Sequence, residues 1–395
     1  MTAPATIVVL TNVPTPYRLA LHARIDRELP EVRLLTVYTH DVADQGWTLS
    51  AGDQARVFRF GQGDSVNASS RVSSIPREWA KGGRICRWLA EQSPRPAALL
   101  LCGYNDPGRL RVLRWCTRHR LPVFLVGDSN IKGEQVSGIK ALIKRVVVSR
   151  VVRACAGVMP CGSFGAEFFR KYGARDERIF YVPYEPDYAL IENLPPATID
   201  AARERFGFQP HRRRIVFCGR FIPAKRPDLA IDAFARLAGQ RTDWDLVMIG
   251  DGDLRRACEQ RVPAALSSRV RFTGFIGNQD VISAIYKSSD VFLLPSVYEP
   301  WGVVINESAC AGMAIVATNT VGAAGELVRD GVNGRTFPPS DLDALTAALL
   351  DVTDPARLQQ YRAASAGVLA DWRDRGDPVK GIRSALRTVG VLPST

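Results

Sequence analysis

Short apolar runs alternate with helix-length segments along almost the whole chain, and this alternation constrains the fold more than any other feature. Most of the runs are continuously apolar, which is typical of parallel strands buried between two layers of helices. The predicted strands are residues 7–10, 32–38, 97–101, 123–126, 157–160, 179–182, 215–218, 244–249, 270–273, 291–294 and 314–317. The pattern therefore predicts two doubly wound, Rossmann-like α/β domains.

The 395 residues are enough for two domains of similar size. Prolines 183, 186, 195 and 196 cluster between the two sets of strands, so we place the domain boundary near Ile191. The prediction is a first domain over 1–190, a second over 191–375, and a tail over 376–395 whose helix, near 378–388, packs back on the first domain. Residues 46–76 are expected to form a loop with one short strand at 55–60.

The charge balance favours an anionic partner. The chain has 52 Lys and Arg and 40 Asp and Glu, a formal net charge of +12. Such a charge attracts phosphates, anionic lipid or nucleic acid, and it does not distinguish among these partners. Basic residues recur on a predicted helix at Arg111, Arg114 and Arg118 and again between Lys140 and Arg153, so we predict contact with an anionic membrane surface. No aromatic-interleaved basic motif indicates a nucleic-acid partner.

The spacing of the cysteines and the hydropathy of the chain bear on the cellular compartment in which the protein works. The eight cysteines show no Cys-x-x-Cys spacing and the chain has only four His, so we predict reduced thiols and no metal site. No stretch has the composition of a membrane-spanning helix or a secretory signal. The prediction is a cytoplasmic protein, peripheral at the inner face of the membrane.

Two turns after predicted strands carry the residue types of a phosphate site. Gly219, Arg220 and Lys225 follow the strand at 215–218, where a glycine permits close backbone approach and two cations suit a diphosphate. After the strand at 291–294 comes Glu299, and then a helix that must start near Trp301 or Gly302.

The start of that helix suits an anion. The backbone N–H groups of Gly302, Val303 and Val304 would point at a phosphate, because the first amides of a helix have no partner within it. Glu307, about 1.5 turns further along, could accept two hydrogen bonds from a vicinal diol such as ribose.

These segments, with Gly250-Asp251-Gly252, Phe272-Thr273-Gly274-Phe275 and Gly322-Ala323-Ala324-Gly325-Glu326, resemble the retaining nucleotide-sugar glycosyltransferases of family 4 over about residues 215–350. The resemblance implies the GT-B fold, in which two Rossmann-like domains face each other across a cleft. It also implies a metal-independent, hexosyltransferase-type enzyme with no cofactor. The chain departs from the family at 322–325 and at Trp301, where a Phe is more usual.

The resemblance also implies roles for single residues. Arg220 and Lys225 would hold the donor diphosphate and act in catalysis, Glu307 would bind the ribose, and Glu299 would face the donor sugar and act in catalysis. Gly274, Phe275 and Ile276 match the turn that reads the nucleobase. In the first domain, Asp128 and Ser129 stand where many members have a catalytic His, so Asp128 is the acceptor-side candidate.

The predicted function is transfer of a sugar from a nucleoside diphosphate to an acceptor hydroxyl with retention at the anomeric carbon. The acceptor would be a lipid-linked saccharide or other glycan precursor, in polysaccharide biosynthesis. The alternatives are a GT-B nucleotide-sugar epimerase, a phosphorylase that would need pyridoxal phosphate, and a non-catalytic nucleotide-sugar binding module.

Overall fold

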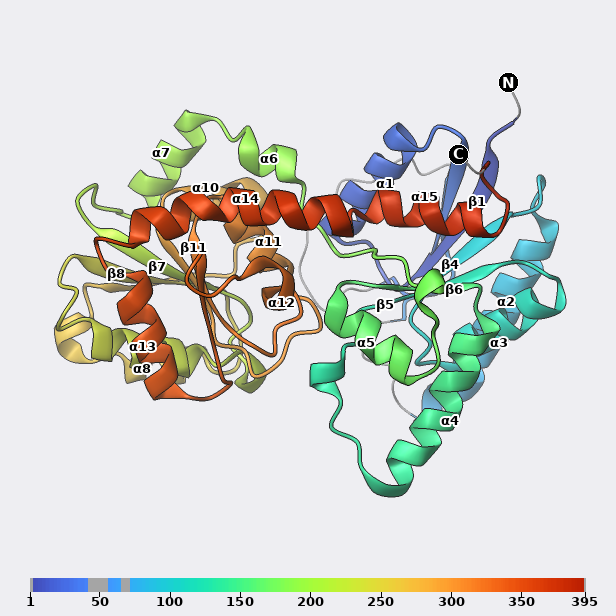
Figure 1. Cartoon of the computed structure of the whole chain (residues 1–395), viewed down its shortest axis with the longest axis horizontal. Helices are drawn as coiled ribbons and strands as arrows, with labels where there is room; N and C mark the ends of the chain where they lie inside the picture. Colours follow the sequence, from blue (N-terminus) through green and yellow to red (C-terminus); the bar gives the residue numbers. More distant parts are fainter. Residues whose placement is uncertain (1–2, 42–55, 65–71, 394–395) are drawn as a thin grey trace. The chain divides into compact units, whose positions relative to one another are not determined.

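The computed structural model describes residues 3–41, 56–64 and 72–393. The chain divides into two compact units, residues 1–184 with 376–395, and residues 185–375 (Figure 1). The boundary predicted near Ile191 is wrong, because it would cut helix α6 (Tyr188–Glu192). That helix belongs to the second unit, where the Asn306 amide donates to the Tyr188 hydroxyl at 2.9 Å.

The first unit is built on a six-stranded parallel sheet in the order β3-β2-β1-β4-β5-β6. Its strands are β1 (Ala5–Thr11), β2 (Val32–Tyr38), β3 (Val57–Arg59), β4 (Ala98–Cys102), β5 (Val123–Gly127) and β6 (Gly157–Pro160). Successive side chains of β1 enter opposite layers, Val8 and Leu10 one core, Ile7 and Val9 the other. This explains why the strand is apolar throughout.

Helices cover both faces of this sheet. They are α1 (Pro16–Glu28), α2 (Ile75–Glu91), α3 (Pro107–Arg118), α4 (Gly138–Ala154), α5 (Ser163–Lys171) and α15 (Pro378–Thr388). Helix α15 buries Val379, Ile382 and Leu386 in the same core as Ile25 of α1. Gly381 is needed there, because a Cβ at this position would lie 2.0 Å from the Tyr181 carbonyl oxygen.

The second unit repeats the arrangement with the sheet β12-β11-β10-β7-β8-β9. The strands are β7 (Arg213–Cys218), β8 (Trp244–Ile249), β9 (Val270–Gly274), β10 (Val291–Leu294), β11 (Ala314–Thr318) and β12 (Gly334–Phe337). The helices besides α6 are α7 (Pro196–Arg205), α8 (Pro227–Leu237), α9 (Arg255–Arg261), α10 (Gln279–Lys287), α11 (Val303–Cys310), α12 (Ala324–Leu327), α13 (Leu342–Val352) and α14 (Leu358–Gly376). Numbered within each unit, both sheets have the strand order 3-2-1-4-5-6, so the prediction of two Rossmann-like domains is confirmed.

The structure corrects the predicted strands in two places. Residues 179–182 are not a strand, although the amides of Phe180 and Val182 donate to the carbonyls of Val158 and Pro160 of β6, because the only bridge formed is an isolated one at Ile179. The sixth strand of the second sheet, β12, was missed because Gly334-Arg335-Thr336-Phe337 is short and half polar. At 55–60 the structure has the three-residue β3, while residue 55 and most of the predicted loop at 46–76 lie outside the described residues.

Candidate functional site

The candidate site lies at the carboxyl ends of β7 and β10 in the second unit. These strands are neighbours, and the strand order reverses between them. In open α/β sheets this reversal leaves a crevice outside the strand ends, where ligands bind. Gly219 follows β7 directly, and the loop that carries Glu299 follows β10.

The turn after β7 is held close to the turn after β8. The Gly219 amide donates to the Ile249 carbonyl at 3.0 Å, and a Cβ on Gly250 would lie 1.9 Å from the Gly219 oxygen. Phe221 is fully buried, whereas Arg220 is exposed. Arg220 therefore lies on the exposed side of the turn, while its neighbour Phe221 occupies the buried side.

Lys225 and Glu299 meet directly although 74 residues separate them, the Lys225 ammonium donating to Glu299 Oε1. A backbone bond of 2.9 Å from the Val297 N–H to the Ala224 carbonyl joins their loops. The Ser296 hydroxyl donates to the same Glu299 oxygen at 2.8 Å. The carboxylate is thus fixed in a buried position beside a cation.

Helix α11 begins at Val303, with Gly302 as its N-cap at φ 93°. A side chain here would be strained in the left-handed region, and its Cβ would lie 3.1 Å from Val321. The amides of Val303 and Val304 have no acceptor within the helix, because both lie in its first turn, and neither donates to any residue that the structure describes. The half-buried start of α11 therefore offers two free N–H groups and the positive end of a helix dipole to an anion.

Glu307 is buried in the second turn of α11. It accepts a hydrogen bond of 3.1 Å from the Gln279 amide, at the start of α10. The Tyr286 hydroxyl lies near it without the geometry of a hydrogen bond. Burial raises the pKa of Glu307 to about 7, so about half of this carboxyl is protonated at neutral pH, and hydrogen bonds donated by a ligand would favour its charged form.

The turn Gly274-Phe275-Ile276 ends β9, next to β8. Gly274 has φ 75°, and its carbonyl accepts from the Gly250 amide at 3.0 Å. Ile276 is buried and Phe275 is half exposed. The structure thus brings together Gly219, Lys225, Glu299 and residues 302–304 at the carboxyl ends of β7 and β10. The turn 274–276 lies at the carboxyl end of β9, two strands from β7.

The loop that carries Glu299 is fixed by backbone contacts with residues 321–323. The amides of Gly322 and Ala323 donate to the carbonyls of Glu299 and Trp301 at 3.1 and 2.8 Å. A Cβ on Gly322 would lie 2.2 Å from the Pro300 oxygen. The departure from the family at 322–325 therefore retains the glycine that the loop needs.

Replacing Gly322 by alanine is expected to push this loop away and to lower the free energy of unfolding by about 1–3 kcal/mol. Gly367 is the matched control, because it is exposed on α14 and a Cβ there meets nothing within 4 Å. Urea unfolding of both alanine variants measures the difference. A Gly322 variant as stable as the Gly367 variant would contradict this role.

Trp301 is buried against Trp372 of α14, with ring centroids 5.7 Å apart. Its ring therefore supports the loop from within the unit and is only 2% exposed to a ligand. The Trp that stands in place of the more usual Phe therefore acts on the support of the loop that carries Glu299.

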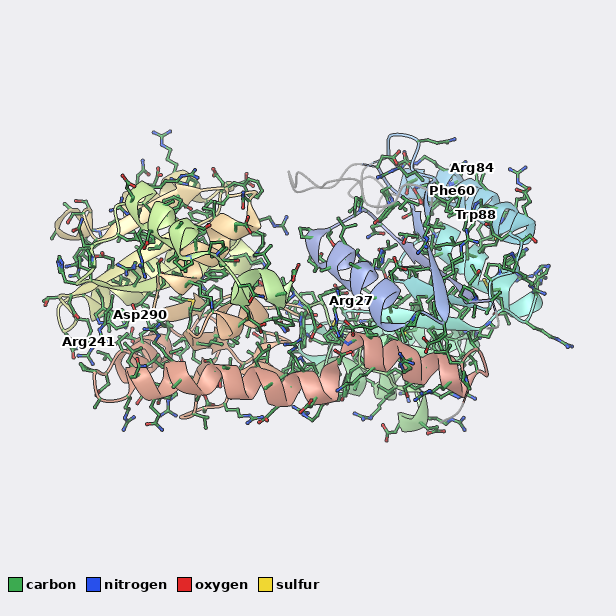
Figure 2. All side chains as sticks on the ribbon, turned by 90° about the horizontal axis from the view of Figure 1, so that it is seen from above. Arg27, Phe60, Arg84, Trp88, Arg241 and Asp290 are labelled. Atoms are coloured by element: carbon green, nitrogen blue, oxygen red, sulfur yellow. The ribbon has the colours of Figure 1, made fainter. Side chains whose placement is uncertain are left out.

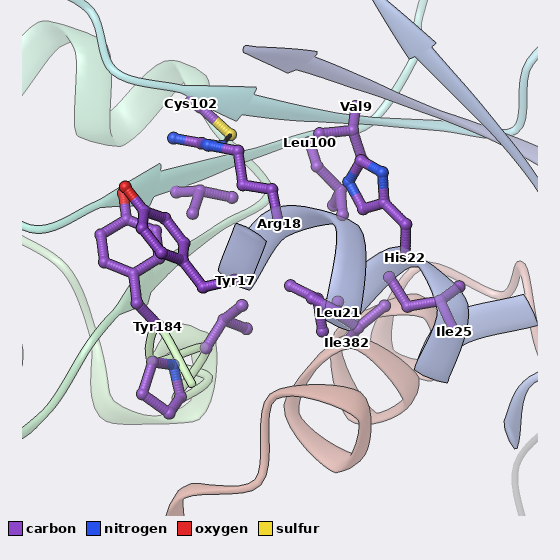
Figure 3. Close-up of a pocket in the computed structure, with 13 residues that line it drawn as sticks. Val9, Tyr17, Arg18, Leu21, His22, Ile25, Leu100, Cys102, Tyr184 and Ile382 are labelled. Atoms are coloured by element: carbon purple, nitrogen blue, oxygen red, sulfur yellow. Dashed lines mark hydrogen bonds between the residues drawn. The ribbon is translucent and has the colours of Figure 1, made fainter. Parts of the chain in front are cut away.

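In the first unit, Asp128 follows β5, and burial raises the pKa of its carboxyl while the Arg18 charge opposes that shift. Arg18 lines a small cavity, with its guanidinium 3.4 Å from the Cys102 sulfur and 5.6 Å from the Tyr184 ring centre (Figure 3). The Tyr17 ring packs on Tyr184 at 5.1 Å. Arg18 is thus a polar group of the first unit that the sequence analysis left without a role.

Sequence reasoning also missed Gln279 and Ser296, the partners of the two site carboxylates. Ser296 stands three residues before Glu299, in a loop already singled out, and could have been found there. Gln279 reaches Glu307 across 28 residues of sequence. No local pattern signals such a contact.

Comparison with known proteins shows that the second unit, which carries the candidate site, is similar to glycosyltransferases. Residues 212–354 match the family Glycosyl transferases group 1. An uncharacterised glycosyltransferase of Methanocaldococcus jannaschii is 34% identical over 36% of this chain and 36% of its own length. Glycogen synthase of Mycobacterium tuberculosis is 32% identical over 58% of this chain and 53% of its own. The chain thus spans about a third to a half of the length of these curated relatives.

Among solved structures, HepE of Anabaena in complex with UDP and glucose has a TM-score of 0.71 at 20% identity, covering 98% of this chain and 100% of that one. A likeness at this level of identity establishes the fold. The prediction of the GT-B fold class is confirmed in its two Rossmann-like domains.

Proposed function

We propose that this chain is a retaining glycosyltransferase that moves a sugar from a nucleoside-diphosphate sugar to an acceptor hydroxyl. The observation that carries the proposal is that Lys225, Glu299 and the free amides of α11 lie together at the carboxyl ends of β7 and β10. All of them belong to the segment that matches the family Glycosyl transferases group 1. The nucleotide class is supported by HepE, which binds UDP. The epimerase and the binding module stay as alternatives.

Each group has a task in this proposal. The amides of Val303 and Val304 bind the diphosphate, and Glu307 accepts hydrogen bonds from the ribose hydroxyls. Lys225 and Arg220 neutralise the charge that grows on the leaving diphosphate, a task that a metal ion performs in other enzymes. Glu299 stays beside Lys225 and faces the sugar.

The experiment is an assay with UDP-, GDP- and ADP-sugars, with the anomeric configuration of the product followed by NMR. Transfer with retention supports the proposal. A changed sugar nucleotide without any acceptor would identify an epimerase, and binding without turnover on any acceptor would identify a binding module.

We further propose that the acceptor is lipid-linked and that α4 docks the enzyme on an anionic membrane. Ile139, Leu142, Ile143, Val146 and Val147 are exposed at helical spacing, Ile139 by 78% and Ile143 by 59%. Exposed basic residues Lys140, Arg145, Arg150 and Arg153 lie on the same helix, and none has an ion-pair partner among the described residues. An apolar stripe with unpaired cations suits the interface of an anionic bilayer.

The remaining features of α4 fit this assignment. Val148, Val151 and Val152 anchor its other side in the core of the unit, and its first half extends past the neighbouring helices of that unit (Figure 1). No helix in the described part of the chain is long and apolar enough to cross a membrane. The contact that we propose is therefore made by side chains on the surface of α4.

The double variant Ile139→Ser, Ile143→Ser is expected to bind vesicles of phosphatidylcholine and phosphatidylglycerol at least tenfold more weakly, because each isoleucine buries apolar area in the bilayer. Val332→Ser, an exposed residue of the second unit, is the control. Flotation at low salt measures binding, since screening is weakest there. Equal flotation of wild type and double variant, or none for wild type, would refute membrane docking by α4.

A further inference from the structure

A polar groove lies at the amino ends of β7 and β10 in the second unit. The candidate site lies at the carboxyl ends of the same strands. The groove has a volume of about 430 Å³ and is lined by the residues that precede or begin β7, the end of α10 and the start of α14. Asp290, labelled in Figure 2, lies in it directly before β10. Because Gly219 and Glu299 follow the far ends of β7 and β10, the groove and the donor site are separate.

The lining is strongly cationic. One carboxylate, Asp290, faces six permanent cations, which are Arg203, Arg212, Arg213, Arg214, Lys287 and Arg362. Both oxygens of Asp290 are already used, one by the Arg214 backbone amide at 2.9 Å and the other by the Arg362 guanidinium at 2.7 Å. The groove therefore has no spare negative charge of its own.

Carboxylates outside the lining balance only some of these cations. Arg203 pairs with Asp200 at 3.0 Å, Arg212 with Asp245 at 2.7 Å and Arg213 with Asp243 at 4.0 Å. Lys287 has no ion-pair partner among the residues that the structure describes.

Arg214 is buried, and its guanidinium donates to two neutral groups, the carbonyls of Ser288 at 2.6 Å and Gln209 at 3.1 Å. Burial lowers the pKa of Arg214, while the nearby charges of Asp290 and Asp245 oppose that shift. An anion in the groove would likewise favour the charged guanidinium.

A buried hydroxyl adds a second and independent sign of a ligand. Ser288 lines the groove and is 4% exposed, and its Oγ has no hydrogen-bond partner in the described structure. Buried polar atoms are almost always satisfied in folded proteins, so one without a partner calls for an explanation. An oxyanion held by Lys287 could supply an acceptor for it.

We propose that this groove binds the phosphate or diphosphate group of a small phosphorylated ligand, with Lys287 as the principal cation. Ammonium and guanidinium groups make their strongest hydrogen bonds to such oxyanions. The volume exceeds that of the oxyanion alone and lies within the range of small-molecule sites. The proposal does not depend on the glycosyltransferase function, because the groove shares no residue with the donor site.

The test is a calorimetric titration of inorganic diphosphate into the full chain and four variants. These are Lys287→Gln, Lys287→Glu, Lys225→Ala and the control Arg33→Gln, which removes one exposed cation of the first unit that has no ion-pair partner among the described residues. Wild type is expected to show a site that Lys287→Gln weakens about tenfold and Lys287→Glu removes. Lys225→Ala is expected to leave this site intact and to weaken a different one.

Unchanged diphosphate binding in both Lys287 variants would overturn the groove as an anion site. Equal weakening by Arg33→Gln would do the same, because it would show an effect of net charge. If Lys225→Ala changes nothing while the Lys287 variants lose a site, the donor proposal fails and the groove stands. Lys287 makes no ion pair with described residues, so its variants should fold, and their unfolding midpoints check this.

Discussion

Lys225→Ala is expected to lower kcat about 10²–10³-fold while weakening donor binding much less. The negative charge on the diphosphate is larger in the transition state of transfer than in the bound donor, so a cation placed there stabilises the transition state more. Lys225 is only partly exposed and is fixed by Glu299, so it is in place before the reaction. Arg220, which is exposed, is expected to give a smaller loss.

The structure adds a stability effect to the Lys225 prediction. Removing the lysine leaves the buried Glu299 carboxylate without its cation, which should lower the free energy of unfolding by about 1–3 kcal/mol. The loss of kcat must therefore be measured well below the unfolding temperature of the variant. The double variant with Arg220→Ala should lose less than the sum of the two single losses, since both cations act on one group.

The measurement is kcat and donor Kd for wild type and the three variants, each with and without chelator. Chelator is expected to leave wild-type turnover unchanged. Full kcat with a raised Kd in Lys225→Ala would show that the lysine binds substrate and transition state equally. Loss of wild-type turnover on chelation would contradict the metal-independent mechanism.

Glu307→Gln is expected to change how stability depends on pH. The pKa of Glu307 is about 7 in the folded chain and close to its ordinary value, about 4.3, when unfolded. Between these values the native state holds a proton that the unfolded state has released. This carboxyl therefore makes the free energy of unfolding fall as pH rises from about 4.5 to 7, by about 3 kcal/mol in all, and not beyond.

The glutamine variant lacks this group, so its stability should fall about 2.5 kcal/mol less than that of wild type between pH 5 and pH 8. Urea unfolding at both pH values gives the comparison. Glu204→Gln, which is exposed on α7, is the matched control. The same pH dependence in wild type and Glu307→Gln would show that Glu307 keeps an ordinary pKa.

The same substitution tests the ribose contact. The charged carboxylate is the better acceptor, so donor affinity of wild type should rise with pH through about 7 and then level off. Glu307→Gln should bind donor about 1.5–3 kcal/mol more weakly at pH 8 and lose this rise. An unchanged Kd in the folded variant would remove Glu307 from the donor site.

Local patterns were enough to predict most of the fold. The continuous apolar runs located ten of the twelve strands in the described part of the chain, because parallel strands buried on both faces need apolar residues throughout, and β3 was predicted separately as the short strand at 55–60. A glycine before an apolar segment located the start of α11, and the last helix was predicted at its observed residues, 378–388. The short polar β12 had no comparable signal.

Long-range contacts could not be predicted. The domain boundary depends on the contacts that α6 makes with α10 and α11 of the second unit, among them the bond between Tyr188 and Asn306. The exposure of Arg220 depends on the burial of Phe221. The pairing of Lys225 with Glu299 follows from the order of β7 and β10 in the sheet, and the one-dimensional pattern does not contain that order.

Calorimetric titration of UDP, GDP and ADP into the wild-type chain, with chelator present, tests whether the ends of β7 and β10 form a nucleoside-diphosphate site. We expect that at least one of them binds, and that Glu307→Gln and Lys225→Ala both weaken the binding. Absence of binding by all three, or equal affinity in wild type and both variants, would contradict a nucleoside-diphosphate site at the ends of β7 and β10.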